Sequence, residues 1–318
     1  MSPSEQKTSP RIVSLLSSNT EMLCEIGLAA ALVGISHECD YPESILHLPR
    51  VTHARVDPTL TSAEIDRQVN DRLREGDSLY VIDEDALLAL RPDILLTQAQ
   101  CDVCAVNIKH VERALERFDA DKQPLSLSFQ PETLEDVFDD MAQLGRAVDQ
   151  PEMAEQAIKR LRRRVDAVTV VAQMAESRPR VLVMEWLDPP MPGGCWTPQL
   201  VEMAGGRHAL GDSTSKTRAR EWEEVAASAA EVLIVSPCGF KIDQTLREID
   251  VFLDRAEVRS LPACSDDRVF VADGAALFNR PGPRLVDTLE FLVQATHPQL
   301  SANSGIPFPE DLAMPYRH

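Results

Sequence analysis

The chain has 318 residues, of which 44% are hydrophobic and 26% charged, an ordinary composition for a globular protein. Its formal net charge of −19 at pH 7 opposes non-specific binding to nucleic acids and to anionic membranes, whose surfaces are also negative. The length exceeds that of one compact core of usual size and predicts two domains or lobes.

The N-terminal stretch MSPSEQKTSPRIVSLLSSN lacks the unbroken apolar segment of a secretory signal. No later window approaches the roughly 18 apolar residues of a spanning helix, so we expect no membrane insertion. These features predict a cytoplasmic protein, or a periplasmic one if a leader has been removed. The seven cysteines, an odd number, fit poorly with a purely structural set of disulfides.

Residues 10–130 alternate between strand and helix patterns. A helix beginning near Ser17 should end at Gly27, because glycine commonly terminates helices. Alternation of this kind predicts a mainly parallel sheet covered on both faces. The predicted strands lie at 12–16, 31–36 and 94–97, with a short edge strand and a helix within 78–90, and further helices at 62–75 and 107–118.

Residues 131–178 carry helical periodicity interrupted only by Pro151, which predicts one long helix or two in succession and a bridge between lobes. The basic patch at 159–164 lies in this bridge. We interpret it as a solvated helical face rather than a nucleic-acid site, because it lacks interleaved aromatic residues and the chain is acidic.

The strand and helix pattern returns in residues 179–297. The segments RIVSLLSSNTEMLCEIG and RVLVMEWLDPP…CWTPQLVEMAGG both run strand, polar turn, helix and glycine, which indicates two related lobes. The predicted fold is therefore α/β: two Rossmann-like lobes with mainly parallel sheets, a long helical bridge and a ligand cleft between the lobes. Residues 298–318 are predicted to form a poorly ordered tail.

In open parallel sheets, ligands bind beyond the carboxyl ends of the strands. The loops at these positions carry polar, aromatic and cysteine side chains, and Trp196 is predicted to face a cleft. The candidate ligand-binding residues are His37, Glu38, Cys39, Tyr41, Gln98, Gln100, Cys101, Cys104, Trp186, Cys195, Trp196, Cys238, Phe278, Asn279 and Arg280.

Cys101 and Cys104 form the single C-x-x-C pair, which has three interpretations. They line a pocket, form a thioredoxin-like redox pair, or bind zinc together with His37 and Cys39, since a structural zinc site needs four ligands. Glu38 with Asp40, or Glu185 with Asp188, is a further candidate acid–base pair. Phosphate-binding and dinucleotide-binding glycine motifs are missing from the sequence, so no nucleotide is expected.

The order of several motifs resembles the cobalamin-binding members of the periplasmic substrate-binding proteins of ABC importers. These motifs are RIVSLLSSNTEMLCEIGLAAALVGIS, CDYP, LRPDILLT, PP…LVEMAGG and FNRPGPR, and the resemblance covers roughly residues 11–295. It implies a corrinoid held by the loops named above, and glutamates that dock an ABC permease. Glu202 matches one such glutamate, and Glu64 is a looser match for the other.

The sequence departs from this family in placing HEC and C-x-x-C on the ligand loops. We therefore expect a non-catalytic corrinoid-binding protein, acting as carrier, sensor or transport-related receptor, with axial coordination of cobalt by His37 or Cys39 as a hypothesis. Its partner is an ABC permease or a cytosolic corrinoid-using protein. Alternatives are a protein of the same fold that binds haem, a metal chelate, zinc or iron, and a thiol- or metal-dependent enzyme on this scaffold.

Overall fold

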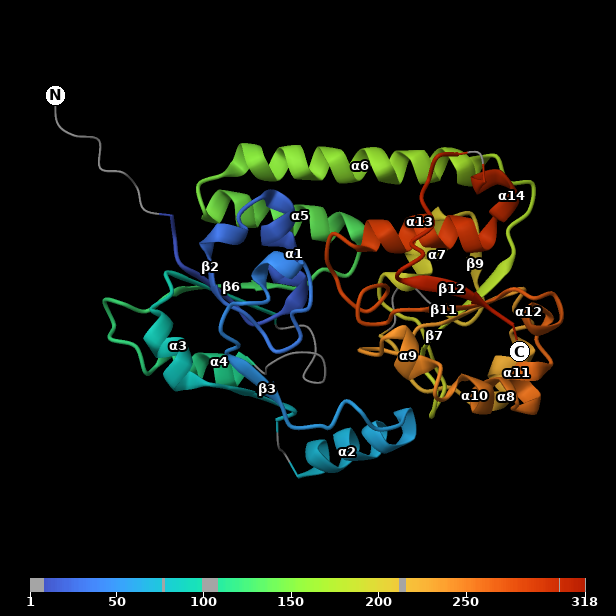
Figure 1. The fold of residues 1–318 in the computed structure, drawn as a ribbon, viewed down its shortest axis with the longest axis horizontal. Helices are drawn as coiled ribbons and strands as arrows, with labels where there is room; N and C mark the ends of the chain where they lie inside the picture. The colour runs from blue at the N-terminus through green and yellow to red at the C-terminus, as the bar shows by residue number, and fades with distance from the viewer. Residues whose placement is uncertain (1–8, 76–77, 99–107, 212–215, 303, 318) are drawn as a thin grey trace. The chain divides into compact units, whose positions relative to one another are not determined.

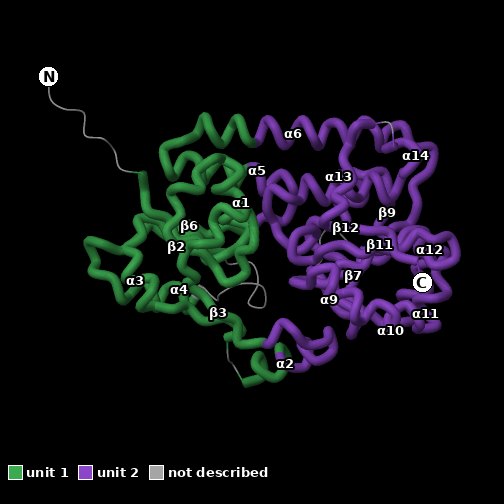
Figure 2. Tube along the Cα trace, viewed as in Figure 1, with its two compact units in different colours: residues 1–56, 69–130, 139–157 green, residues 57–68, 131–138, 158–318 purple. Residues whose placement is uncertain are grey.

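The computed structural model describes residues 9–75, 78–98, 108–211, 216–302 and 304–317. Its contacts divide the chain into two compact units (Figure 2). Unit 1 comprises residues 1–56, 69–130 and 139–157, and unit 2 comprises residues 57–68, 131–138 and 158–318. The Gln98–Cys104 loop predicted to contact a ligand lies largely outside the described residues, including Gln100, Cys101 and Cys104.

Unit 1 contains a parallel four-stranded sheet in the order β2-β1-β5-β6. Its strands are β2 (Leu32–Gly34), β1 (Ile12–Ser14), β5 (Ile94–Gln98) and β6 (Leu125–Phe129). The helices α1 (Ser17–Ile26), α3 (Glu84–Leu90) and α4 (Ile108–Leu115) belong to the same unit. The short helices η1 (Ala29–Ala31) and η2 (Glu43–Ile45) also lie in this unit, whose α1, α3 and α4 are labelled in Figure 1.

Glycine ends α1 as the sequence predicts. Gly27 adopts a φ of 93°, a left-handed conformation that costs glycine little, and its N–H donates to the carbonyl of Cys24. The short edge strand predicted within residues 78–90 is β4 (Tyr80–Ile82). It pairs antiparallel with β3 (Thr52–Ala54) in a separate two-stranded sheet instead of extending the parallel one.

Unit 2 contains a mixed sheet in the order β12-β11-β10-β7-β8, in which β9 also pairs with β7. The strands β7, β9, β10 and β11 run parallel, whereas β8 and β12 run antiparallel to their neighbours. Their bounds are β7 (Arg180–Trp186), β8 (Met191–Pro192), β9 (Arg207–His208), β10 (Val232–Val235), β11 (Val269–Ala272) and β12 (Ala313–Tyr316).

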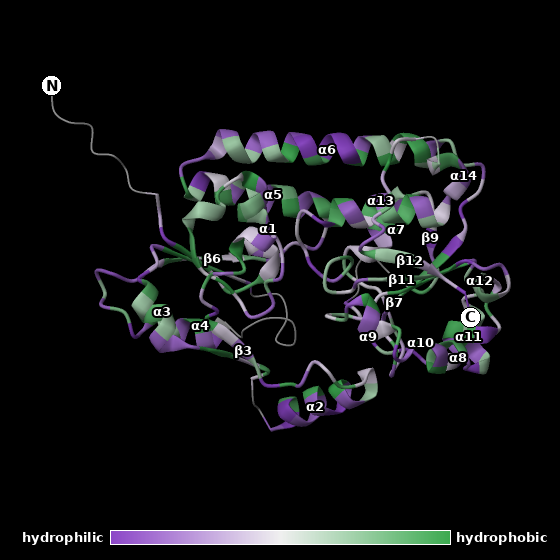
Figure 3. Ribbon diagram, viewed as in Figure 1, coloured by the Kyte–Doolittle hydropathy of each residue, from purple (hydrophilic) through white to green (hydrophobic). Residues whose placement is uncertain are grey.

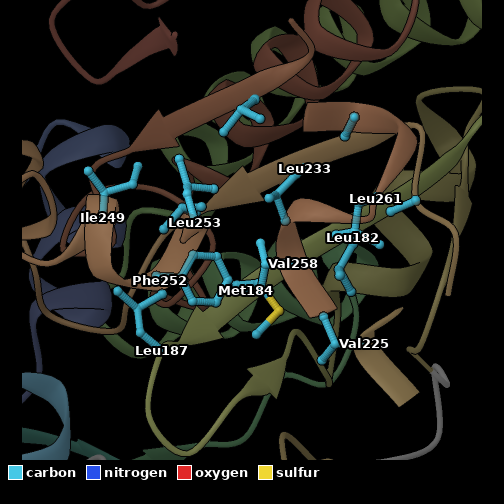
Figure 4. Packing of buried hydrophobic residues seen from close by; sticks show 14 of the residues in the cluster. Leu182, Met184, Leu187, Val225, Leu233, Ile249, Phe252, Leu253, Val258 and Leu261 are labelled. Carbon is cyan, nitrogen blue, oxygen red and sulfur yellow. The ribbon is translucent and has the colours of Figure 1, made fainter. Parts of the chain in front are cut away.

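The described helices of unit 2 are mostly short. Those that lie wholly within the unit are α7 (Thr197–Met203), α8 (Trp222–Ala227), α9 (Ile242–Thr245), α10 (Ile249–Leu253), α11 (Ala256–Arg259), α12 (Pro262–Ser265), α13 (Leu285–Thr296) and α14 (Pro298–Ser301). Figure 4 shows the apolar core where strands β7 and β10 meet these helices, with Met184, Leu233 and Phe252 among its buried residues. Burying a side chain of this size stabilises the fold by about 1.5–3 kcal/mol.

The prediction of a poorly ordered C-terminal tail is wrong. Residues 313–316 form β12, which pairs with β11 through Ala272 opposite Ala313 and Phe270 opposite Pro315. Pro315 lies in an edge strand, where its missing N–H removes no hydrogen bond to a second neighbour. The tail is therefore part of the sheet of unit 2.

Residues 131–178 form two helices, one of the two arrangements that the periodicity allows. They are α5 (Leu134–Ala147) and α6 (Pro151–Gln173), with Pro151 at the start of the second helix, where its missing N–H costs nothing. The middle of α6 is hydrophilic (Figure 3), as its basic patch requires. Two of these arginines form ion pairs within unit 2: Arg162 with Glu135, and Arg164 with Asp287 and Glu290.

The helix α2 (Ser62–Arg74) begins on a carboxylate from another part of unit 2. The main-chain N–H of Ser62 lies 3.0 Å from Oε1 of Glu248, and the Ser62 hydroxyl donates to Oε2 at 2.7 Å. A carboxylate at this position satisfies a free N–H and is favoured by the helix dipole. Within the described ranges, no helix combines the length and the apolar character needed to span a membrane.

Candidate ligand-binding site

The carboxyl ends of the parallel strands in unit 1 lie at one edge of its sheet. His37, Glu38, Cys39 and Tyr41 follow β2 at this edge, and Gln98 ends β5. The structure therefore brings the first group of predicted residues to the expected place. Tyr41 is 51% exposed, whereas Gln98 is buried at 6%.

A hydrogen-bond network around Thr52 holds the imidazole of His37. The Nδ1 atom lies 2.7 Å from Oγ1 of Thr52, and the main-chain N–H of His37 donates to the same oxygen at 2.9 Å. The Thr52 hydroxyl in turn donates to Oγ of Ser36 at 3.1 Å. Burial, followed by the charges of His53 and Arg50, lowers the pKa of His37 to about 4, so the ring is neutral at pH 7.

A single arginine fixes the backbone that carries His37. Nη1 of Arg50 donates to the carbonyl oxygens of Ser36, His37 and Cys39 at 2.9, 2.8 and 2.9 Å. These bonds satisfy carbonyls that the loop itself leaves without a strand partner. The loop therefore presents His37 from a defined backbone position.

The structure argues against Cys39 as a ligand contact. Its side chain is 1% exposed and its Sγ lies 3.2 Å from Oγ1 of Thr20, so the thiol belongs to the interior of unit 1. Cys24, one turn along α1 from Thr20, is half-buried, and burial raises the pKa of its thiol to about 12. Of the two side chains considered for axial coordination, only His37 is partly accessible.

The described residues contain no group of three or more histidine, cysteine or acidic side chains arranged to hold a metal ion. Cys101 and Cys104 fall outside the ranges searched. A zinc site, a redox pair and a pocket lining involving these two cysteines therefore stay predictions.

In unit 2, Glu185 is a buried carboxylate near the carboxyl end of β7. It accepts hydrogen bonds from the hydroxyls of Thr197 at 3.0 Å and Thr217 at 2.5 Å. Burial raises the pKa of Glu185 to about 6, and these two bonds act in the opposite direction. Asp188, the residue predicted to pair with Glu185, lies 3.8 Å from Nη2 of Arg255.

Trp186 ends β7 and is half-buried against Phe240, with ring centroids 5.4 Å apart in an edge-to-face arrangement. Its indole Nε1 is buried and has no hydrogen-bond partner within the described part of the chain. Cys238, in the loop after β10, is exposed, and its main-chain N–H donates to the carbonyl of Glu185. This edge thus combines an aromatic pair with a polar loop.

The prediction that Phe278 and Trp196 face a ligand is wrong for both side chains. Phe278 is fully buried and packs edge-to-face on Phe291, and Trp196 is 8% exposed. Trp196 donates its indole N–H to the carbonyl of Phe278. Both side chains are therefore core residues that hold two loops of unit 2 together.

The neighbouring predicted residues are more accessible. Asn279 is half-buried and donates its amide to the carbonyl oxygens of Ser236 and Gly274, so it joins the loops after β10 and β11. Arg280 and Cys195 are half-buried. These three side chains remain candidates for ligand contact.

Sequence reasoning did not single out Ser36, Arg50, Thr52, Thr197 or Thr217, although they position the candidate side chains. Serine and threonine are common in loops, so their presence carries little signal. The useful signal is Glu185, an acidic residue near the end of the otherwise apolar strand β7. A buried carboxylate needs hydrogen-bond donors, so this residue could have indicated that partners such as Thr197 and Thr217 lie nearby.

Comparison with known proteins identifies the family. Residues 12–276 match the periplasmic binding protein family. A vitamin B12-binding protein of Yersinia pestis (strain Pestoides F) is 24% identical over 287 residues, which are 89% of this chain and 85% of the relative. The chain belongs to the periplasmic binding protein family, and it is accordingly a binding protein rather than an enzyme, as predicted.

Solved structures share the fold. The periplasmic vitamin B12-binding protein BtuF of Vibrio cholerae superposes with a TM-score of 0.67 at 20% identity, covering 92% of this chain and 98% of that one. The apo form of the periplasmic heme-binding protein RhuT from Roseiflexus sp. RS-1 gives a TM-score of 0.69 at 20% identity, covering 92% and 99%. The predicted two-lobed α/β fold is thereby confirmed.

Proposed function

We propose that this protein binds a metal tetrapyrrole, with a corrinoid as the preferred ligand. The observation that carries the proposal is the match to a vitamin B12-binding protein along 89% of the chain. The identity of 24% is too low to transfer a ligand by itself, so the proposal also draws on the side chains at the sheet edge of each unit, considered separately.

The side chains at these edges suit a large, flat ligand. Tyr41 and His37 supply partly accessible rings in unit 1, and Trp186 supplies one in unit 2. Aromatic side chains give a macrocycle apolar contact, while a few polar groups fix its orientation. Glu38, Asn279 and Arg280 are the polar candidates at the same edges.

Haem is the second candidate ligand. The heme-binding protein RhuT superposes as well as the vitamin B12-binding protein, and the identities are equal at 20%. Likeness at this level supports the fold and does not distinguish the two macrocycles. A direct comparison of both ligands is therefore part of the test.

Delivery to an ABC permease in the periplasm is the biological role we propose. The solved relatives are described as periplasmic, so the expectation of a cytoplasmic protein gains no support from them. Of the two docking glutamates suggested by resemblance, Glu202 is exposed on α7. Glu64 instead accepts hydrogen bonds from the main-chain N–H and hydroxyl of Thr61 at the start of α2, which makes it the weaker docking candidate.

Equilibrium dialysis of the full chain against aquocobalamin, cyanocobalamin and haemin tests the proposal. We expect one equivalent of a cobalamin to be retained after desalting, with weaker retention of haemin. If haemin binds more strongly than either cobalamin, the preferred ligand is haem and not a corrinoid. Retention of neither macrocycle, with zinc or iron present near one equivalent, would overturn the proposal in favour of a metal-ion site.

A further inference from the structure

The hydrogens around Thr52 determine which nitrogen of His37 carries a proton. Oγ1 of Thr52 has one hydrogen, and that hydrogen points to Oγ of Ser36 at 3.1 Å. The 2.7 Å contact between Nδ1 of His37 and Oγ1 of Thr52 must then use a hydrogen on Nδ1. In a neutral imidazole this assignment leaves Nε2 with an unprotonated lone pair.

The Nε2 atom is also available. It makes no hydrogen bond to the described residues, and the His37 side chain is partly exposed in unit 1. The ring packs beside Tyr80, with centroids 5.3 Å apart, and Arg50 holds the backbone on either side. A fixed ring with a free lone pair is the arrangement of a metal-ligating histidine, whose other nitrogen donates to a supporting group.

We propose that Nε2 of His37 is the axial protein ligand to the metal of the bound tetrapyrrole, in an orientation set by Thr52. This inference rests on the proposed function. The macrocycle supplies the four equatorial nitrogens, so one protein side chain suffices. With aquocobalamin, a cobalt–nitrogen bond forms as the cobalt–oxygen bond to water breaks and water leaves. The oxidation state of cobalt is unchanged, and no proton moves because Nε2 carries none.

This coordination defines a class of ligand. The preferred ligand is a metal tetrapyrrole with an exchangeable axial position, such as aquocobalamin. Cyanocobalamin holds cyanide tightly at that position and should bind through shape alone. The protein therefore discriminates between two forms of the same macrocycle by metal chemistry.

Absorption titrations of the full chain with both cobalamins test the inference. We expect aquocobalamin to shift its spectrum on binding and cyanocobalamin to bind without a shift. The substitution His37→Gln should abolish the shift and weaken aquocobalamin binding at least about tenfold more than it weakens cyanocobalamin binding. Exposed His53 offers a matched control, and His53→Gln should keep the wild-type spectrum.

Thr52 provides the second variant. Thr52→Val removes the hydroxyl that fixes the tautomer and should reduce the shifted fraction, whereas Thr52→Ser retains the hydroxyl and should restore it. If wild-type and His37→Gln proteins bind aquocobalamin equally and with the same spectrum, the inference is wrong while the proposed function stands. If neither cobalamin is retained by the wild-type protein, the proposed function itself fails.

Discussion

The indole N–H of Trp196 donates a hydrogen bond of 2.5 Å to the main-chain oxygen of Phe278. The donor comes from the loop before α7 and the acceptor from the loop after β11, two segments that are 82 residues apart. Both loops lead to the carboxyl edge of the sheet in unit 2. A buried bond between them fixes the backbone from which Asn279 and Arg280 extend.

Trp196→Phe should therefore destabilise the protein, because it leaves the carbonyl of Phe278 buried without its donor. An unsatisfied buried acceptor costs about 1–3 kcal/mol, and we expect the free energy of unfolding in urea to fall by this amount. Trp186→Phe is a matched control, since the Nε1 atom of Trp186 has no partner within the described ranges. Equal losses from the two substitutions would contradict the role of the Trp196 bond.

Glu185 should lower the free energy of unfolding as the pH rises. A carboxylate whose pKa is lowered in the folded protein has the opposite effect. Its pKa rises from 4.5 to about 6 in the folded protein, so the folded state binds the proton more tightly. The resulting stabilisation is complete below pH 4.5 and is lost as the pH rises through 6, a change of about 2 kcal/mol.

The variant Glu185→Gln isolates this contribution. Half-buried His37 and buried His208 have pKa values lowered to about 4, so they destabilise the fold as the pH falls below 6.5 and oppose Glu185 in the total profile. The difference in unfolding free energy between wild type and variant should therefore be measured at pH 4.5 and pH 7. A difference that does not change between these pH values would show that Glu185 does not titrate as inferred.

Much of the fold could be predicted from local signals. Gly27 marks the end of α1, and Pro151 marks the start of α6, because each residue restricts the backbone in a characteristic way. The strand β12 could not be predicted, since its four residues include Pro315 and its formation depends on the distant edge of β11. Local composition alone carries no information about that pairing.

The candidate site could be predicted only in part. The rule that ligands bind at the carboxyl ends of strands located His37, Tyr41 and Trp186, because it needs no more than the strand positions. It could not distinguish exposed side chains from buried ones, and so it included Phe278, which packs in the core. The hydroxyl of Thr52 acts on His37 from 15 residues away, a relationship that only the folded chain reveals.

Arg164 should stabilise unit 2 through its contacts with α13. It donates to Oε1 and Oε2 of Glu290 at 2.8 and 2.6 Å, and the Glu290 side chain is only 7% exposed. Arg164→Met would leave a buried carboxylate without its partner. Because the arginine side chain is 39% exposed and partly screened by solvent, we expect a loss of about 2 kcal/mol, below the range for fully buried pairs.

A double-mutant cycle measures the interaction itself. Glu290→Gln alone should also destabilise the protein, and the double variant should lose less than the sum of the two single losses. The ion pair Arg74–Asp71 is a control, because both side chains are at least 70% exposed and the pair should contribute little. Additive losses at Arg164 and Glu290 would contradict the inferred coupling.

Gly274 should tolerate no side chain, because a Cβ atom there would lie 1.8 Å from the carbonyl oxygen of Pro237. This close approach joins the loops after β10 and β11, and the N–H of Gly274 also donates to the carbonyl of Phe240 at 2.8 Å. Gly274→Ala must push these loops apart, so we expect a loss of about 3 kcal/mol, at the upper end of overpacking costs.

Gly239→Ala in the same region is the matched control for this clash. Its Cβ atom would meet no neighbour within 4 Å, and only the φ of +79° opposes the substitution, at a cost of about 1–2 kcal/mol. Urea unfolding of both variants compares a steric conflict with backbone strain. The larger loss must come from Gly274→Ala. Weaker binding of the ligand proposed above should accompany it, because the displaced loops carry Asn279 and because Trp186 packs on Phe240. A larger loss from Gly239→Ala would contradict the close approach of the two loops.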